Sequence, residues 1–165
     1  MSNVQFATLT GLCSGCVVNM ISRGLDDCYG NDPSTVIANG TTVVSETNRG
    51  LYLAALVPAS CSVTDFERFD TSSYSGNSVN NTIRLLNYLN QTPNGTLLIC
   101  INWDDVTSSA LQSACPFILD TLGVDLSPIQ FRGKVAFMTE IGYPEKAVAS
   151  LLPAGGPCLN MTVTV

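Results

Sequence analysis

The run of residues 51–57 constrains the fold more than any other feature of this sequence. All seven side chains are apolar or aromatic, and turn-forming residues stand on either side. A run of this length between turns indicates a strand that is buried on both faces, and it is too short to cross a membrane. Residues 96–102 have the same character. Two such strands require cover on both sides, so the rest of the chain must supply it.

Two segments with helical spacing of apolar residues can provide part of this cover. The spacing predicts a first helix from about 78 to 91, which the turn residues 92–95 end. A second helix is expected from about 113 to 122, with Ser113 as its N-cap and Gly123 directly after its end. The apolar face of the first helix is expected to consist of Val79, Ile83, Leu86 and Leu89, with Leu85 widening it.

Further strands are predicted along the chain. Asn39-Gly40 between β-branched runs is a strong hairpin signal, because both residues tolerate positive φ. The expected strands are 4–10, the two arms of the hairpin at 35–44, the more exposed 65–71, then 130–141 and a short terminal strand at 161–165.

Charge and composition exclude several classes of function. Only 12% of the residues are charged and the net charge is −6, against about 25% charged residues in an ordinary domain. Without a basic run, neither nucleic acid nor an anionic membrane surface is an expected partner. The chain has no histidine, which excludes Ser-His-Asp and Cys-His catalysis and most zinc sites. We therefore expect a protein that is not an enzyme, with no cofactor, no metal and no membrane insertion.

Seven cysteines are many for 165 residues. Together with the low charge and several glycosylation sequons, they favour an oxidising, extracellular setting and a secreted protein. We interpret the Cys-x-x-Cys at Cys13 and Cys16 as structural rather than redox or metal-binding, since no second pair follows. The disulfide candidates are Cys13, Cys16, Cys28, Cys61, Cys115 and Cys158. Cys100 lies within the buried run 96–102 and is expected to be a free, inert thiol.

Five Asn-x-Thr sequons are present, beginning at Asn39, Asn80, Asn90, Asn94 and Asn160. The sequon at Asn90 is the weakest, because Pro93 follows its threonine. Glycosylation is therefore expected at Asn39, Asn80, Asn94 and Asn160.

Six short motifs, in order and in register over residues 36–141, resemble the ILEI/PANDER-like domain family. They are Asn48-Arg-Gly-Leu51, Phe69-Asp-Thr71, the run 94–99, Asp104-Asp105, Thr121-Leu-Gly123 and the run 131–137. The resemblance implies an α+β fold with two packed, mostly antiparallel β-sheets flanked by two or three helices, and a single domain over 1–165. The family includes secreted signalling proteins and the sugar-binding stem domain of a glycosyltransferase.

The resemblance also implies a sugar site at Arg49, Asp104 and Arg132. All three are expected at strand ends, where an aspartate between two arginines can bind sugar hydroxyls as both donors and acceptors. The family pattern places an acidic residue after the second arginine, but Gly133 stands there. A sugar site also needs an aromatic platform, for which Trp103 and Phe131 are the candidates. The alternative for these charged residues is a structural ion-pair network.

Two functions are therefore expected as alternatives. The first is a secreted, non-catalytic module that binds a glycan at the cell surface or in the extracellular matrix. The second is a protein–protein module that acts as a signalling ligand or as a subunit of an extracellular assembly, with self-association through an unpaired cysteine or a free strand edge.

Overall fold

The structure is a computed structural model that describes residues 4–8, 15–23 and 32–165. The strands are β1 (Val4–Thr8), β2 (Val17–Ser22), β3 (Ser34–Ala38), β4 (Thr41–Glu46), β5 (Gly50–Val57), β6 (Ser62–Phe69), β7 (Leu97–Trp103), β8 (Lys134–Glu140), β9 (Tyr143–Leu152) and β10 (Leu159–Thr164). The helices are α1 (Ser78–Gln91) and α2 (Ser109–Leu122).

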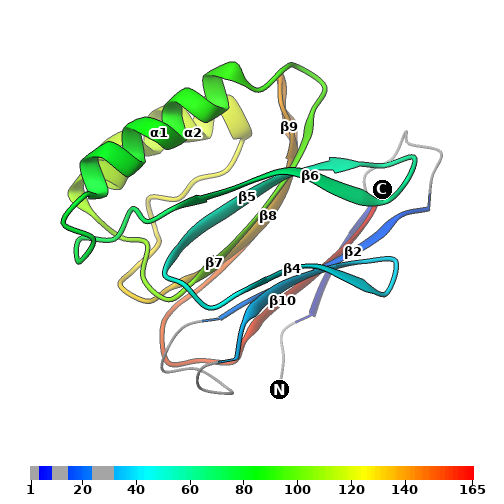
Figure 1. The fold of residues 1–165 in the computed structure, drawn as a ribbon, viewed down its shortest axis with the longest axis horizontal. Coiled ribbons are helices and arrows are strands. Elements are labelled where there is room, and N and C mark those ends of the chain that lie inside the picture. Colours follow the sequence, from blue (N-terminus) through cyan, green and yellow to red (C-terminus); the bar gives the residue numbers. More distant parts are fainter. Residues whose placement is uncertain (1–3, 9–14, 24–31) are drawn as a thin grey trace.

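The described strands form two five-stranded sheets. Sheet A has the order β1-β10-β2-β3-β4 and sheet B the order β6-β5-β7-β8-β9. All strand pairs are antiparallel except β1 with β10. Figure 1 shows both helices over one face of sheet B and sheet A against its other face. The predicted α+β fold of two packed, mostly antiparallel sheets with helices is confirmed.

Sheet B is the middle layer, which explains the two uninterrupted apolar runs. Alternate side chains of β5, such as Leu51 and Leu53, pack under the helices, whereas Tyr52 and Ala54 face sheet A. Every residue of β7 is buried in the same way. A strand covered on both faces has no position for a charged side chain, so its sequence reads as a continuous apolar run.

Helix α1 has the predicted length but turns a different face to the core. Its buried residues are Thr82, Leu85 and Leu89, whereas Val79 and Ile83 are 60% and 50% exposed. The prediction of an apolar face through Val79 and Ile83 is therefore wrong.

Helix α2 begins four residues before the predicted start. Ser108 is its N-cap, and the Ser108 hydroxyl accepts a hydrogen bond from the N–H of Leu111 at 3.1 Å. Its end is as predicted, with Gly123 at φ 70° after the last residue. Strand β8 also begins later than expected, because a turn precedes Lys134. Among the helices of the described residues, none is long and apolar enough to cross a membrane.

A disulfide between Cys16 and Cys61 joins the two sheets. Cys16 immediately precedes β2 in sheet A, and Cys61 lies in the turn between β5 and β6 in sheet B. Cys158 is disulfide-bonded as well, so the predictions for these three cysteines are confirmed. Cys100 is a free buried thiol as expected. The candidates Cys13 and Cys28 lie outside the described residues.

The assignment of Cys115 to a disulfide is wrong. Cys115 is a free thiol on the buried face of α2, and its Sγ lies 3.4 Å from the Leu111 carbonyl oxygen. Burial raises the pKa of both the Cys100 and the Cys115 thiols, which keeps them protonated and unreactive.

Candidate functional site

Three strand ends of sheet B meet around one hollow of about 390 Å³, which we call the arginine hollow. Arg49 directly precedes β5, Asp104 directly follows β7, and Arg132 stands two residues before β8. Because neighbouring strands in this sheet are antiparallel, these three positions fall at the same end of the sheet. Tyr74, Asp105 and Phe131 complete the lining.

Each arginine of the arginine hollow is held by an aspartate. The guanidinium of Arg49 binds Asp70 with two contacts, Nε to Oδ1 at 3.1 Å and Nη2 to Oδ2 at 3.2 Å. The Nε of Arg132 lies 3.3 Å from Oδ1 of Asp104. The sequence therefore correctly predicted that Arg49, Asp104 and Arg132 lie together. Asp104 pairs with Arg132 in place of the acidic residue that the family pattern has at position 133, where this chain has glycine. The second partner, Asp70, was missed.

Two exposed aromatic rings form the apolar wall of the hollow. Tyr74 is 69% exposed and Phe131 is 47% exposed, and their ring centroids lie 5.8 Å apart at an interplanar angle of 54°. The guanidinium carbon of Arg132 stands 5.0 Å from the centroid of Phe131. This cation–π contact fixes the arginine from its second side.

Trp103 is not the aromatic platform of this hollow. It is 9% exposed and packs between the two sheets, and its indole N–H donates to the Asp32 carbonyl oxygen at 3.2 Å. Successive residues of a strand point to opposite faces of the sheet, and Trp103 points to the face of sheet B that packs against sheet A. Of the two candidates, only Phe131 lines the hollow.

A buried amide beneath the hollow fixes the loops that carry Asp104 and Arg132. The side-chain N–H₂ of Asn102 donates to the carbonyl oxygens of Asp104 at 2.8 Å and Gly133 at 2.9 Å. Its Oδ1 accepts from the N–H of Val135 at 2.7 Å and from the Ser22 hydroxyl. The sequence carried a signal for this role, because an asparagine in a buried strand must find hydrogen-bond partners.

Asp105 supports the hollow from within. Its Oδ1 accepts from the N–H of Thr107 at 3.0 Å and from the Thr107 hydroxyl, and its Oδ2 accepts from the Ser72 hydroxyl at 2.6 Å. The same Oδ1 lies 3.4 Å from the backbone nitrogen of Arg132. The buried carboxylate thereby joins three loops at the floor of the hollow.

The backbone at this end is held in unusual conformations. Asp104 and Arg132 both have φ 55°, in the left-handed region that costs an L-residue about 1–2 kcal/mol. Gly50 has φ 145°, and a Cβ on it would lie 2.8 Å from the Phe69 carbonyl oxygen. Only glycine permits this close approach, which brings Arg49 next to Asp70.

The charges that line the arginine hollow are balanced. Two arginines, Arg49 and Arg132, stand with two aspartates, Asp104 and Asp105, and Asp70 pairs with Arg49 outside the lining. The pKa of the Arg49 guanidinium is raised, first by its hydrogen bond to Asp70 and further by the charges of Asp104 and Asp105. Within the described ranges, no group of three or more histidine, cysteine or acidic side chains is arranged to hold a metal ion.

Comparison with known proteins identifies the family. The model of the family described as interleukin-like EMT inducer matches residues 49–143, which is more than half of the chain and includes every residue of the arginine hollow. A search of curated proteins returned no match. The family and the Cys16–Cys61 disulfide are consistent with an extracellular protein. The chain belongs to the interleukin-like EMT inducer family.

Proposed function

We propose that this chain is a secreted, non-catalytic module that binds carbohydrate in the arginine hollow. The observation that carries the proposal is the meeting of Arg49, Asp104 and Arg132 with two exposed aromatic rings around one hollow. A sugar ring has an apolar face of C–H groups and a rim of hydroxyls. Aromatic rings can stack on the apolar face of the sugar, and fixed carboxylate and guanidinium groups can form hydrogen bonds with its hydroxyls.

Preorganisation of the charged groups supports binding rather than catalysis. Both guanidinium groups are already placed by their aspartate partners, so little side-chain freedom is lost when a ligand arrives. The carboxylates are likewise engaged, Asp70 and Asp104 with arginines and Asp105 with hydroxyls. The lack of histidine removes the commonest general base as well.

The charge of the site favours neutral sugars. Each guanidinium group is already paired with a carboxylate, and the net charge of −6 on the whole chain disfavours sulfate and carboxylate substituents. We therefore expect neutral glycans to bind and sulfated or uronic-acid glycans to be rejected.

A glycan-array screen of the secreted, oxidised protein tests the proposal, followed by calorimetry on the best neutral ligand. The variant Arg132→Ala should lower the affinity by about tenfold or more, because it removes one charged hydrogen-bonding group of the hollow and its contact with Asp104. The matched control is Arg84→Ala, which removes an arginine paired with Glu67 outside the hollow and should bind normally. Binding that is equal in both variants would place the site elsewhere, and no binding to any neutral glycan would refute the proposal.

A second candidate function, docking to another extracellular protein, is favoured by one observation. Val79 and Ile83 lie one helical turn apart on α1 and are both exposed by half or more, and neighbouring exposed apolar side chains on a helix are typical of contact surfaces. If the array is negative, the double variant Val79→Ser, Ile83→Ser should abolish self-association or partner binding, as measured by light scattering and by pull-down from extracellular fluid. Unchanged association would exclude this surface.

A further inference from the structure

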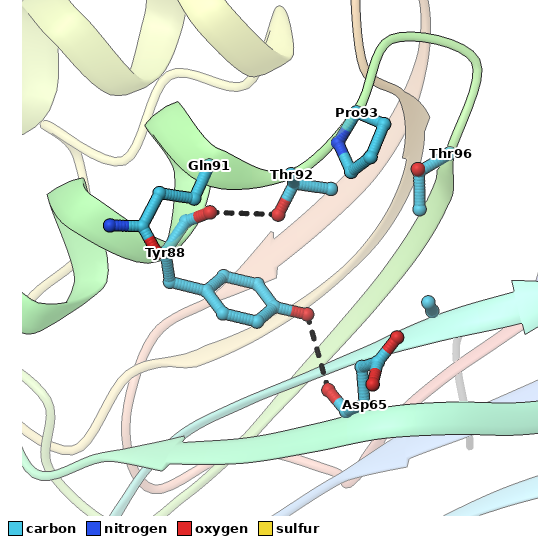
Figure 2. Close-up of a pocket in the computed structure, with 7 residues that line it drawn as sticks. Asp65, Tyr88, Gln91, Thr92, Pro93 and Thr96 are labelled. Atoms are coloured by element: carbon cyan, nitrogen blue, oxygen red, sulfur yellow. Dashed lines mark hydrogen bonds between the residues drawn. The ribbon is translucent and has the colours of Figure 1, made fainter.

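A second hollow lies at the opposite end of strands β5, β7 and β8 from the arginine hollow. Two cavities of about 210 and 490 Å³ share Ala55, Asp65, Pro93 and Thr96 in their walls. Figure 2 shows the smaller of the two, between the end of α1 and strand β6. We call the two cavities together the distal groove.

A bulge in the edge strand opens the distal groove. The register between β5 and β6 shifts between Leu53 and Ala55, and Asp65 on β6 has φ 50°. Such a bulge bends its strand away from the regular ladder. The hydroxyl of Tyr88 on α1 donates to the Asp65 carbonyl oxygen at 3.2 Å and holds the bent strand in place (Figure 2).

The sequon at Asn94 lies next to this groove, although Asn94 itself lines neither cavity and its side chain packs against Gly142 in the β8–β9 turn. Asn94 is exposed in the turn between α1 and β7. Its neighbours Pro93 and Gly95 and the sequon residue Thr96 all line the groove. The turn is fixed by its backbone, with the N–H of Gly95 donating to the Ile141 carbonyl oxygen at 2.8 Å. In the described part of the chain, neither the Asn94 amide nor the Thr96 hydroxyl takes part in a side-chain hydrogen bond.

The sequons at Asn80, Asn90 and Asn160 are engaged in the fold. At Asn39 only the side-chain oxygen is engaged, which accepts from the N–H of Val17 at 2.9 Å, and both Asn39 and Thr41 are exposed. The Asn80 amide donates to the side-chain oxygen of Asn77, the N-cap residue of α1. The third residue of that sequon, Thr82, is buried, and its hydroxyl donates to the Ser78 carbonyl oxygen at 2.8 Å. Asn160 belongs to β10, between two other strands of sheet A, and its side-chain oxygen is buried.

The Asn90 sequon is engaged as well. The hydroxyl of its threonine, Thr92, donates to the Tyr88 carbonyl oxygen at 2.7 Å, and Pro93 follows directly. Asn39 and Asn94 are thus the two sequon asparagines in exposed turns, and of these two it is Asn94 whose chain neighbours line the distal groove.

We infer that Asn94 carries an N-linked glycan and that the first sugars of this glycan lie in the distal groove. In the modification, the amide nitrogen of Asn94 forms a bond to the anomeric carbon of an oligosaccharide held on a lipid diphosphate. The bond from that carbon to the diphosphate oxygen breaks, the lipid diphosphate leaves with the electron pair, and a base of the transferase takes the amide proton. The inference rests on the proposed secretion, but not on sugar binding in the arginine hollow.

The walls of the groove suit a tethered sugar. Pro58 and Pro93 offer apolar ring faces, and Thr64 and Thr96 offer hydroxyls. Thr64 and Asp65 belong to β6, which is an edge strand of sheet B. A glycan in this position also covers backbone groups that an edge strand would otherwise present to a second chain.

Site-resolved mass spectrometry tests the modification. The protein is secreted from a eukaryotic cell line with a heterologous leader, and enzymatic release of the glycans in heavy-oxygen water converts each occupied asparagine to a labelled aspartate. We expect label at Asn94, and loss of one glycan in Asn94→Gln and Thr96→Ala but not in Asn87→Gln, which alters an exposed asparagine outside any sequon. An unlabelled Asn94 in the secreted protein overturns the inference, whatever the protein binds on a glycan array.

Hydrogen exchange tests the position of the glycan. Amides of β6 around Thr64 and Asp65 should exchange faster after the glycan is removed from the folded protein. Amides of β4, an edge strand of the other sheet, serve as the internal control and should not change. If β6 exchanges equally fast with and without the glycan, the sugars do not lie in the distal groove.

Discussion

The two ends of the same three strands, β5, β7 and β8, are built by different means. At the arginine hollow, ion pairs and the buried amide of Asn102 fix the segments that carry Arg49, Asp104 and Arg132. At the distal groove, a strand bulge and a turn containing Pro93 shape the walls. A ligand that arrives from solution needs a preorganised site, because binding must offset its lost freedom. A tethered sugar is already present at high effective concentration and needs only a compatible surface.

The variant Asn102→Ala should have the largest effect, because it removes the amide on which the arginine hollow depends. The carbonyls of Asp104 and Gly133 and the N–H of Val135 would lose their partners inside the protein. We expect a loss of about 3 kcal/mol in the free energy of unfolding, measured by urea denaturation, together with loss of glycan binding.

The exposed Asn87→Ala is the control for this variant and should be neutral. If Asn102→Ala unfolds at the urea concentration of the native protein, the buried amide does not hold the two loops, and the contrast between the two ends of the strands is lost.

Removing one aromatic ring from the arginine hollow should act on binding alone. Phe131→Ala and Tyr74→Ala should each lower the affinity for a neutral glycan by about tenfold, or ~1.4 kcal/mol, because a stacked ring contributes roughly this much. Both rings are exposed, so the free energy of unfolding should change little. Phe66→Ala removes an exposed ring that stacks on Tyr52 outside the hollow and should leave the calorimetric affinity unchanged. An equal loss of affinity in all three variants would contradict the assignment.

The sequence predicted the buried strands well because burial on both faces leaves an unmistakable pattern. It failed where polar groups are buried. Helix α1 buries Thr82, whose hydroxyl bonds to its own backbone, and this rotates Val79 and Ile83 outward in a way that apolar periodicity does not reveal. Strand β9 was missed because it is a half-exposed edge strand without clear alternation.

The candidate site was predicted in part for a similar reason. Strand ends of one sheet converge, so Arg49, Asp104 and Arg132 could be brought together from their positions in the sequence. Tyr74 lies in a loop whose path depends on tertiary contacts, such as the hydrogen bond from the Ser73 N–H to the Thr107 carbonyl oxygen at 2.8 Å. No local pattern specifies such a contact, and adjacency to Asp104 wrongly favoured Trp103.

Alkaline pH should weaken both ends, because one has a buried tyrosine, Tyr52, and the other a partly buried one, Tyr88. The Tyr52 hydroxyl bonds to the carbonyl of Asn48, next to Arg49, and Tyr88 bonds to Asp65 in the distal groove. Burial, with a smaller effect of nearby acidic groups, raises the pKa of each phenol from 10.0 to about 12. Because the pKa of each phenol is higher in the folded than in the unfolded state, each tyrosine contributes to the free energy of unfolding. This contribution is fully present below pH 10 and is lost as the pH rises to about 12.

Urea denaturation at several pH values, with the phenolate absorbance recorded in parallel, measures this loss. Tyr52→Phe and Tyr88→Phe should each flatten the fall in stability between pH 10 and about 12. If the free energy of unfolding falls as steeply with pH in both variants as in the native protein, other groups cause the alkaline instability.

The smallest effect is expected from Asn94→Gln on glycan binding in the arginine hollow. Strand β7 has seven residues between the two sites, so they lie about 20 Å apart. Sites at this distance without shared partners act independently, and the calorimetric affinity should change by less than about twofold. Since Asn94→Gln removes the proposed glycan and leaves the arginine hollow intact, this measurement separates the two proposals. A large gain in affinity would mean that the glycan on Asn94 reaches the hollow and competes there with the external ligand, so that the two ends of the sheet serve one site.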